Sequence, residues 1–167
     1  MSTTKRWKFL LFLSLMGGVP MLSGCGEAPK QPQAPLVRGV LTTAADCAGL
    51  GTLSVETCAK AIEMAVAEHE AHAPSYPSLK VCEKAEGVDK CERTDTKGYR
   101  PRLMAFIVTM TDPPVAAPLY PTPKGEAGFR TANNSLLLSE DESLTFSRPA
   151  RAAAEMQASK GGGGYKF

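Results

Sequence analysis

One stretch of the chain has apolar residues at the spacing of an amphipathic helix. Between residues 54 and 72, apolar or small side chains and one histidine recur at the i, i+3, i+4 and i+7 spacing: Val55, Cys58, Ala59, Ile62, Ala65, Val66 and His69. Ser54 is a residue type that caps helix N-termini, and Pro74 stops the pattern. The pattern therefore predicts a helix from Ser54 to about His72.

A second, shorter helix is predicted from Leu79 to Glu86. Ser78 supplies a cap at its start, and Gly87 can end it in a left-handed conformation. Leu79 and Cys82 share one face of this helix. Together, the two segments predict a small helical hairpin with cysteines facing inward.

The pattern after residue 100 changes from helical to extended. Residues 102–110 (RLMAFIVTM) are strongly apolar and rich in β-formers, which predicts a buried strand. The alternative is an exposed strand that recruits a partner. The prolines between 113 and 123 predict an extended connector.

Short strands are also predicted near the end of the chain. Residues 128–132 and 135–138 predict a hairpin turning at Asn133 and Asn134, because asparagine tolerates positive φ in tight turns. Residues 143–147 predict a third short strand. Residues 150–159 have helix propensity but a poor apolar face, and we expect the tail 151–167, which ends in KGGGGYKF, to be disordered.

The first 24 residues have the composition of a secretory signal peptide. Lys5, Arg6 and Lys8 precede a short apolar run over 9–16, and Gly17 then interrupts it. This run is shorter than the roughly 20 apolar residues that span a bilayer. The pattern favours a cleaved export signal over a membrane-spanning helix.

The end of this segment, Leu22-Ser23-Gly24-Cys25, resembles the lipobox of bacterial lipoproteins. The resemblance implies that the thiol of Cys25 receives a diacylglycerol, that the chain is cut before it, and that the new amine is acylated, palmitate being among the acyl groups. Gly26 in place of aspartate implies the outer membrane of a Gram-negative host. An ordinary signal peptide with a chance cysteine is the alternative.

Composition changes the picture of the remaining chain in two ways. Residues 25–40 contain three prolines and few large apolar groups, which predicts an extended tether. The chain has 19 basic and 17 acidic residues, but Lys5, Arg6 and Lys8 more than account for this excess, so the rest is close to neutral. A nucleic-acid partner is not expected, because it requires a basic face.

Four further cysteines lie in one region: Cys47, Cys58, Cys82 and Cys91. An even number of cysteines in an exported chain predicts two disulfides. Zinc sites commonly use C-x2-4-C pairs and thioredoxin-like sites use C-x-x-C, and the chain has neither. Nested pairing, Cys58 with Cys82 and Cys47 with Cys91, would clamp the hairpin and is our prediction. Local pairing and a third connectivity stay open.

A family resemblance covers about residues 41–150. The segments ADC, ETCAKAIEMAVAEHEAHAPSY, the later pair Cys82 and Cys91, GFRTANNSLLL and LTFSRPA resemble the YgiB-like family of uncharacterised bacterial envelope proteins. The resemblance implies an exported, often lipid-anchored protein without an established activity. It supplies no catalytic residues.

Candidate chemistry in the chain is sparse. The run Glu68-His69-Glu70-Ala71-His72 is one residue short of the zincin motif H-E-x-x-H. His69 and His72 are therefore only weak candidates for a metal site, and a polar helix end explains them equally well. The sequence contains no G-x-S-x-G, phosphate-binding loop or dinucleotide fingerprint.

The sequence thus predicts an α+β protein in four parts. They are a signal peptide over 1–24, a lipid-anchored tether over 25–40, a YgiB-like domain over 41–150 with a disulfide-stapled helical hairpin at 44–92 followed by short strands, and a disordered tail over 151–167.

The predicted function is that of a non-enzymatic accessory or interaction module. It would be held on the outer membrane facing the periplasm by the lipid at Cys25, with no other cofactor. Partners would be the membrane itself and an envelope protein or cell-wall material. The alternatives are a metal-binding or hydrolytic enzyme using His69 and His72, and a thiol-redox protein.

Overall fold

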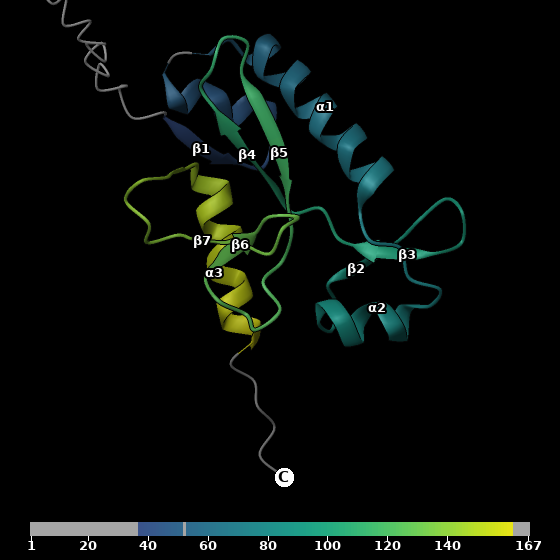
Figure 1. Ribbon diagram of the computed structural model, residues 1–167. Coiled ribbons are helices and arrows are strands. Elements are labelled where there is room, and N and C mark those ends of the chain that lie inside the picture. Colours follow the sequence, from purple (N-terminus) through teal and green to yellow (C-terminus); the bar gives the residue numbers. More distant parts are fainter. Residues whose placement is uncertain (1–36, 52, 162–167) are drawn as a thin grey trace, which may run out of the picture. The chain divides into compact units, whose positions relative to one another are not determined.

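The computed structural model describes residues 37–51 and 53–161 and shows the predicted α+β fold (Figure 1). Its main sheet has the order β5-β4-β1-β8. The strands are β1 (Arg38–Leu41), β4 (Ala105–Thr109), β5 (Val115–Leu119) and β8 (Thr145–Phe146). β4 is antiparallel to β1 and to β5, whereas β8 is parallel to β1. The predicted strand at 102–110 is confirmed as β4, which lies inside the sheet.

The two faces of the sheet build two separate clusters of buried side chains. Val40 and Leu41 point to opposite faces, because successive strand residues alternate. Val40 belongs to one cluster together with its β8 neighbour Phe146. Leu41 belongs to the other together with Val108. Burial of both faces explains why the sequence of β4 is almost continuously apolar.

One face is covered by α1 (Val55–His72) and by the 3-10 helix η1 (Ala44–Leu50). Both the start and the end of α1 agree with the prediction. Ser54 caps the helix by accepting a hydrogen bond of 3.1 Å from the backbone N–H of Thr57. Cys58, Ala61 and Ala65 form the buried stripe of α1.

The opposite face is covered by α3 (Arg148–Gly161), which packs against β1 and β6. This helix corrects the prediction of a disordered tail over 151–167, and residues 162–167 lie outside the described part. Ala150 and Ala154 are fully buried. Alanines allow the helix to approach the sheet closely, so a segment with few large apolar residues still buries a face.

Two small hairpins complete the fold. α2 (Leu79–Glu86) packs on the hairpin of β2 (Cys91–Arg93) and β3 (Tyr99–Pro101). β6 (Gly128–Arg130) pairs with β7 (Leu136–Leu138), as predicted, and Asn134 in its turn has φ of 65°. Gly87 ends α2 at the predicted position, but with φ of 109° and ψ of 156° rather than in the predicted left-handed conformation. L side chains rarely adopt such a φ.

The disulfides within the described residues are local, so the nested prediction is wrong. Cys47 is bonded to Cys58 and Cys82 to Cys91, with Cα–Cα distances of 6.4 and 6.2 Å. Cys58 lies in the first turn of α1, and the 14 residues from there to His72 span about 21 Å of helix. Because α2 follows the far end of α1, Cys58 is out of reach of Cys82. The two helices pack mainly on other elements rather than as a clamped hairpin.

Two other boundaries also differ from the predictions. The tether predicted over 25–40 is wrong for residues 38–40, which form most of the inner strand β1. Residues 1–36, including Cys25, lie outside the described part. The proline-rich connector contains the regular strand β5, with Pro118 inside it. Proline is tolerated there because β5 lies at the edge of the sheet.

Peptide mapping distinguishes the local disulfides from the nested ones. Trypsin leaves Cys47 and Cys58 in a single peptide, 39–60, because no Lys or Arg interrupts it. Under non-reducing conditions we expect this peptide to run alone with an internal disulfide, and peptides 81–84 and 91–93 to be joined. Mass spectrometry with and without reduction checks this. A cross-link between 39–60 and either other peptide would contradict the local pairing.

The carboxylate of Asp46 predicts a dependence of stability on pH. Partial burial raises the pKa of Asp46, but hydrogen bonds from Thr42, Thr43 and Ser147 outweigh it and hold the pKa below its ordinary value of 3.8. A group with a lowered pKa stabilises the fold above its unfolded pKa, and this contribution is lost as the pH falls through the folded value.

We therefore expect Asp46→Asn to be less stable than wild type at neutral pH, and to lose less stability between about pH 5 and about pH 3. Urea unfolding at several pH values measures both effects. Glu63→Gln, on the exposed face of α1, is the matched control and should keep the wild-type profile. An equal acid-induced loss in Asp46→Asn and wild type would rule out this role.

Candidate functional site

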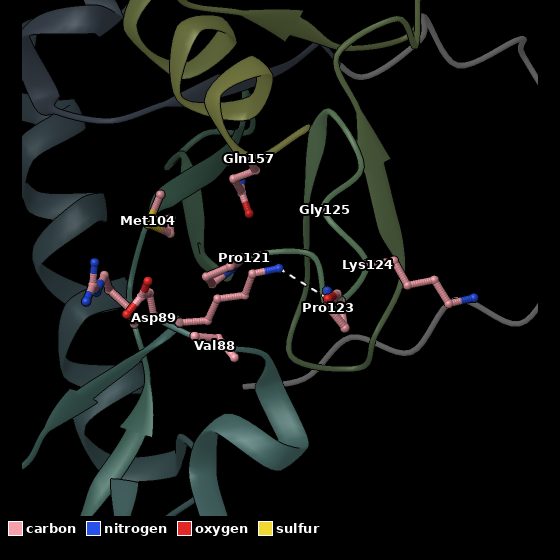
Figure 2. A pocket seen from close by; sticks show the side chains of 10 residues that line it. Val88, Asp89, Met104, Pro121, Pro123, Lys124, Gly125 and Gln157 are labelled. Atoms are coloured by element: carbon pink, nitrogen blue, oxygen red, sulfur yellow. Dashed lines mark hydrogen bonds between the residues drawn. The ribbon is translucent and has the colours of Figure 1, made fainter. Parts of the chain in front are cut away.

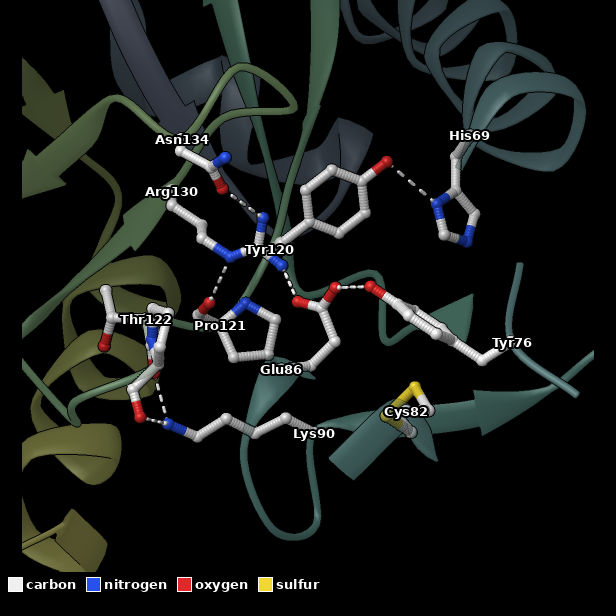
Figure 3. Close-up of polar contacts among 12 residues, drawn as sticks. His69, Tyr76, Cys82, Glu86, Lys90, Tyr120, Pro121, Thr122, Arg130 and Asn134 are labelled. Carbon is white, nitrogen blue, oxygen red and sulfur yellow. Dashed lines mark hydrogen bonds and ion pairs between the residues drawn. A yellow bond between two sulfur atoms is a disulfide. The ribbon is translucent and has the colours of Figure 1, made fainter. Parts of the chain in front are cut away.

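A network of polar side chains lies between the end of α1, the α2–β2–β3 region and the segment joining β5 to β6 (Figure 3). We call it the polar network. Its members are His69, Tyr76, Glu86, Glu92, Arg100, Tyr120, Arg130 and Asn134.

His69 is held by contacts at both ring nitrogens. The side chain is 2% exposed, Nδ1 lies 3.1 Å from the hydroxyl of Tyr120, and Nε2 lies 3.1 Å from Oε1 of Glu92. Arg100 donates to the same Glu92 oxygen at 2.7 Å. Burial raises the pKa of Glu92, but the hydrogen bonds from His69 and Arg100 outweigh it and lower the pKa. These contacts join α1 to β2 and to the end of β5.

Glu86 and Arg130 form a buried ion pair in the second half of the network (Figure 3). Their side chains are 8% and 7% exposed, and Nη2 of Arg130 donates to Glu86. The hydroxyl of Tyr76 also donates to Glu86, at 2.6 Å. Burial, reinforced by the bond and the charge of Glu86, raises the pKa of Tyr76 to about 12.

Arg130 uses its remaining donors on other elements. Its Nε donates to the carbonyl oxygen of Pro121 at 3.1 Å, and its Nη1 donates to Asn134 at 3.0 Å. The guanidinium lies 5.4 Å from the centre of the Tyr120 ring, a cation–π contact. The backbones of Tyr120 and Arg130 also pair with each other. Arg130 therefore ties α2, the end of β5 and the β6–β7 hairpin together.

The structure separates the two histidines that the sequence suggested as metal ligands. His69 points inward to Tyr120 and Glu92, whereas the His72 side chain is 70% exposed and pairs with Glu68 at 3.2 Å. Although they are one helical turn apart, one side chain is buried and the other exposed, and they have different partners, so they do not converge on one site. Within residues 37–51 and 53–161 no group of three His, Cys, Asp or Glu side chains is arranged to hold a metal ion.

The Glu86–Arg130 pair is not among the predicted site residues. Arg130 follows Gly128 and Phe129 in β6, and all three residues of this strand are buried. A charged residue in a strand with a buried pattern indicates a partner, but nothing in the sequence points to Glu86, which lies 44 residues earlier. Only the packing of α2 near the hairpin brings them together.

A pocket of about 390 Å³ lies beside the network, between the loop after α2 and the loop that joins β5 to β6 (Figure 2). We call it the Lys90 pocket. Its apolar lining comes from Val88, Met104, Pro121 and Pro123, and its charged lining comes from Asp89, Lys90, Arg102 and Lys124.

Lys90 reaches across to the loop after β5 (Figure 3). Its Nζ donates to the carbonyl oxygens of Thr122 and, at 3.2 Å, of Pro123. Burial lowers the pKa of Lys90, and Arg130 lowers it further, while Glu126 opposes both. Gln157 of α3 fixes the same loop by accepting from the N–H of Thr122 at 3.0 Å. Contacts from Lys90, in the loop after α2, and from Gln157 of α3 thus hold the β5–β6 loop, which forms one side of the pocket.

Removing one partner of the Glu86–Arg130 pair should be strongly destabilising. We expect Arg130→Met or Glu86→Leu to lower the free energy of unfolding by about 3–5 kcal/mol, because each leaves a buried polar partner uncompensated. The double variant Glu86→Leu/Arg130→Met should lose clearly less than the sum of the singles. Urea unfolding at neutral pH measures all of these.

The exposed pair Lys60–Glu56 is the control for this experiment, since its side chains are 71% and 79% exposed. Lys60→Met should change stability little. Strict additivity in the double variant would show that Glu86 and Arg130 do not depend on each other.

Comparison with known proteins identifies a family and no activity. Residues 37–162 match the family described as protein of unknown function (DUF1190). No curated protein matches the chain, and no solved structure matches it either. The matched region begins with β1 and includes α3, so it extends beyond the predicted domain on both sides. Because the match covers most of the chain, this protein belongs to the DUF1190 family of proteins of unknown function.

Proposed function

We propose that this protein is exported and works outside the cytoplasm, as a lipid-anchored, non-enzymatic binding module of the bacterial cell envelope. The observation that carries the proposal is the pair of disulfides, Cys47–Cys58 and Cys82–Cys91. Disulfides persist in oxidising compartments such as the periplasm and are rare in the cytosol. Cys47, Cys58 and Cys82 are fully buried, which is typical of structural cysteines.

The sequence before the domain supports an anchor. Residues 5–25 combine a basic start, a short apolar run and Leu22-Ser23-Gly24-Cys25. Diacylglycerol and an amide-linked acyl chain at Cys25 would together hold the protein stably, because a single chain gives only marginal binding. The outer membrane is our proposed location, on the ground that Gly26 follows the cysteine.

None of the helices in the described part of the chain is long and apolar enough to cross a membrane.

The resemblance to YgiB-like envelope proteins supports the same proposal. Under it, partners would be an envelope protein or cell-wall material, reached by a domain held at the membrane surface. The contacts of His69 support a structural rather than a catalytic role for this residue. Its ring nitrogens contact Tyr120 and Glu92, and the residue is buried, with 2% of its surface exposed. We therefore place binding ahead of hydrolytic, metal or thiol-redox chemistry.

Replacing the proposed attachment residue tests the anchor. We expect Cys25→Ala, expressed with its export signal in a Gram-negative host, to lose palmitate labelling. Ser23→Ala keeps a small residue before the cut and should be labelled like wild type. Globomycin, which blocks the lipoprotein signal peptidase, should cause the wild type to accumulate with higher mass. Equal labelling of Cys25→Ala and wild type would refute the anchor.

A further inference from the structure

We propose that the Lys90 pocket binds a small organic monoanion, namely a carboxylate or a phosphate diester carried on a compact apolar group. The inference does not depend on export or on the lipid anchor, since it uses only residues of the described domain. The volume of about 390 Å³ lies in the range of small-molecule sites, which is about 300–1,000 Å³.

The charges in and around the pocket favour a single negative charge. Lys90, Arg102 and Lys124 line it, against Asp89 as the acidic lining residue. Glu126 is close enough to Lys90 to affect its protonation. Arg130 also acts on Lys90 but is paired with Glu86, so it leaves the balance unchanged. The remaining three cations and two carboxylates leave one positive charge unbalanced. A monoanion would neutralise it, whereas a dianion would face a surplus of negative charge.

Lys90 has spare capacity to contact such an anion. An ammonium group has three N–H donors. Two of them serve the neutral carbonyl oxygens of Thr122 and Pro123, and the part of the chain that the structure describes offers no acceptor to the third. Carbonyl oxygens do not cancel the charge of the half-buried ammonium. A bound carboxylate or phosphate oxygen would supply both an acceptor and a countercharge.

The rim adds two cations that can turn toward a ligand. Arg102 and Lys124 are both exposed, and Figure 2 shows the Lys124 side chain at the rim, extending away from the other lining residues. Arg102 makes only a long contact of 3.4 Å with the carbonyl oxygen of Cys91. Neither side chain contributes to the buried core, so both can be replaced without damage to the fold.

The apolar lining predicts the rest of the ligand. Val88, Met104, Pro121 and Pro123 come from three separate loops and supply the apolar lining of the pocket. Val88 is 72% exposed, so its side chain is accessible to a ligand. The two prolines are rigid, so little conformational entropy is lost when a ligand packs on them. An inorganic anion would contact the charged lining residues and leave the apolar lining residues exposed to water.

A titration of the full chain tests the proposal. The isotope-labelled protein in neutral detergent is titrated with sodium hexanoate, sodium diethyl phosphate and, as the uncharged control, hexanamide. We expect saturable NMR shifts for Val88, Lys90 and Met104 with the two anions, and much weaker binding of hexanamide. Arg102→Gln/Lys124→Gln should weaken hexanoate binding about tenfold, equivalent to about 1.4 kcal/mol.

The control variant Lys80→Gln/Lys84→Gln removes the same charge from exposed positions of α2 outside the pocket. It should bind hexanoate like wild type. Equal weakening in both double variants would show general electrostatic attraction and overturn the proposal. Equal binding of hexanamide and hexanoate, or no saturable shift with either anion, would overturn it as well.

A competition experiment separates the two sources of such an anion. Displacement of hexanoate by phosphatidylglycerol vesicles, but not by phosphatidylcholine vesicles, would indicate that the pocket binds an anionic lipid headgroup. Retention of hexanoate in the presence of both kinds of vesicle would support a pocket for a free soluble acid.

Discussion

The buried pair of Glu86 and Arg130 is the interaction on which the assembly of this domain depends. Charges that leave water must stay paired, because the desolvation cost is compensated only while both partners are in place. Glu86 belongs to α2 and Arg130 to β6. Their contact therefore fixes the α2–β2–β3 region against the hairpin that covers the main sheet. The walls of the Lys90 pocket come partly from the first of these regions, through the loop after α2, and otherwise from the β5–β6 loop, Arg102, Met104 and Gln157 of α3.

The disulfides have a different role from this pair. They join residues only 11 and 9 positions apart, so each constrains a local segment rather than the assembly. Cys47–Cys58 ties η1 to the start of α1, and Cys82–Cys91 ties α2 to β2. Local covalent links and a long-range ion pair together allow a domain with modest apolar clusters to hold one arrangement.

The sequence predicts the elements of this fold better than their partners. Local signals, such as the caps at Ser54 and Ser78 and the Asn134 turn, give α1, α2 and the β6–β7 hairpin, because these depend on neighbouring residues. The nested disulfides fail because the length of α1 separates Cys58 from Cys82. The ordered helix α3 was not predicted because its buried face consists of alanines. Their burial depends on packing against the main sheet, which the local sequence of α3 does not indicate. For the candidate site, His69 stood out in the sequence, but the Glu86–Arg130 pair and the pocket arise only from packing.

The place of β1 in the sheet bears on when the chain can fold. β1 pairs with β4, which lies about 70 residues later, and with β8, which lies more than 100 residues later. Contacts between such distant segments form late, because closing long loops costs entropy before any contact compensates it. β1, the first strand of the domain, therefore completes its pairing only after β8, nearly the last element, is available. For a chain exported as proposed above, this order would keep the domain unfolded while it crosses the membrane, and would let the sheet and the disulfides form together on the far side.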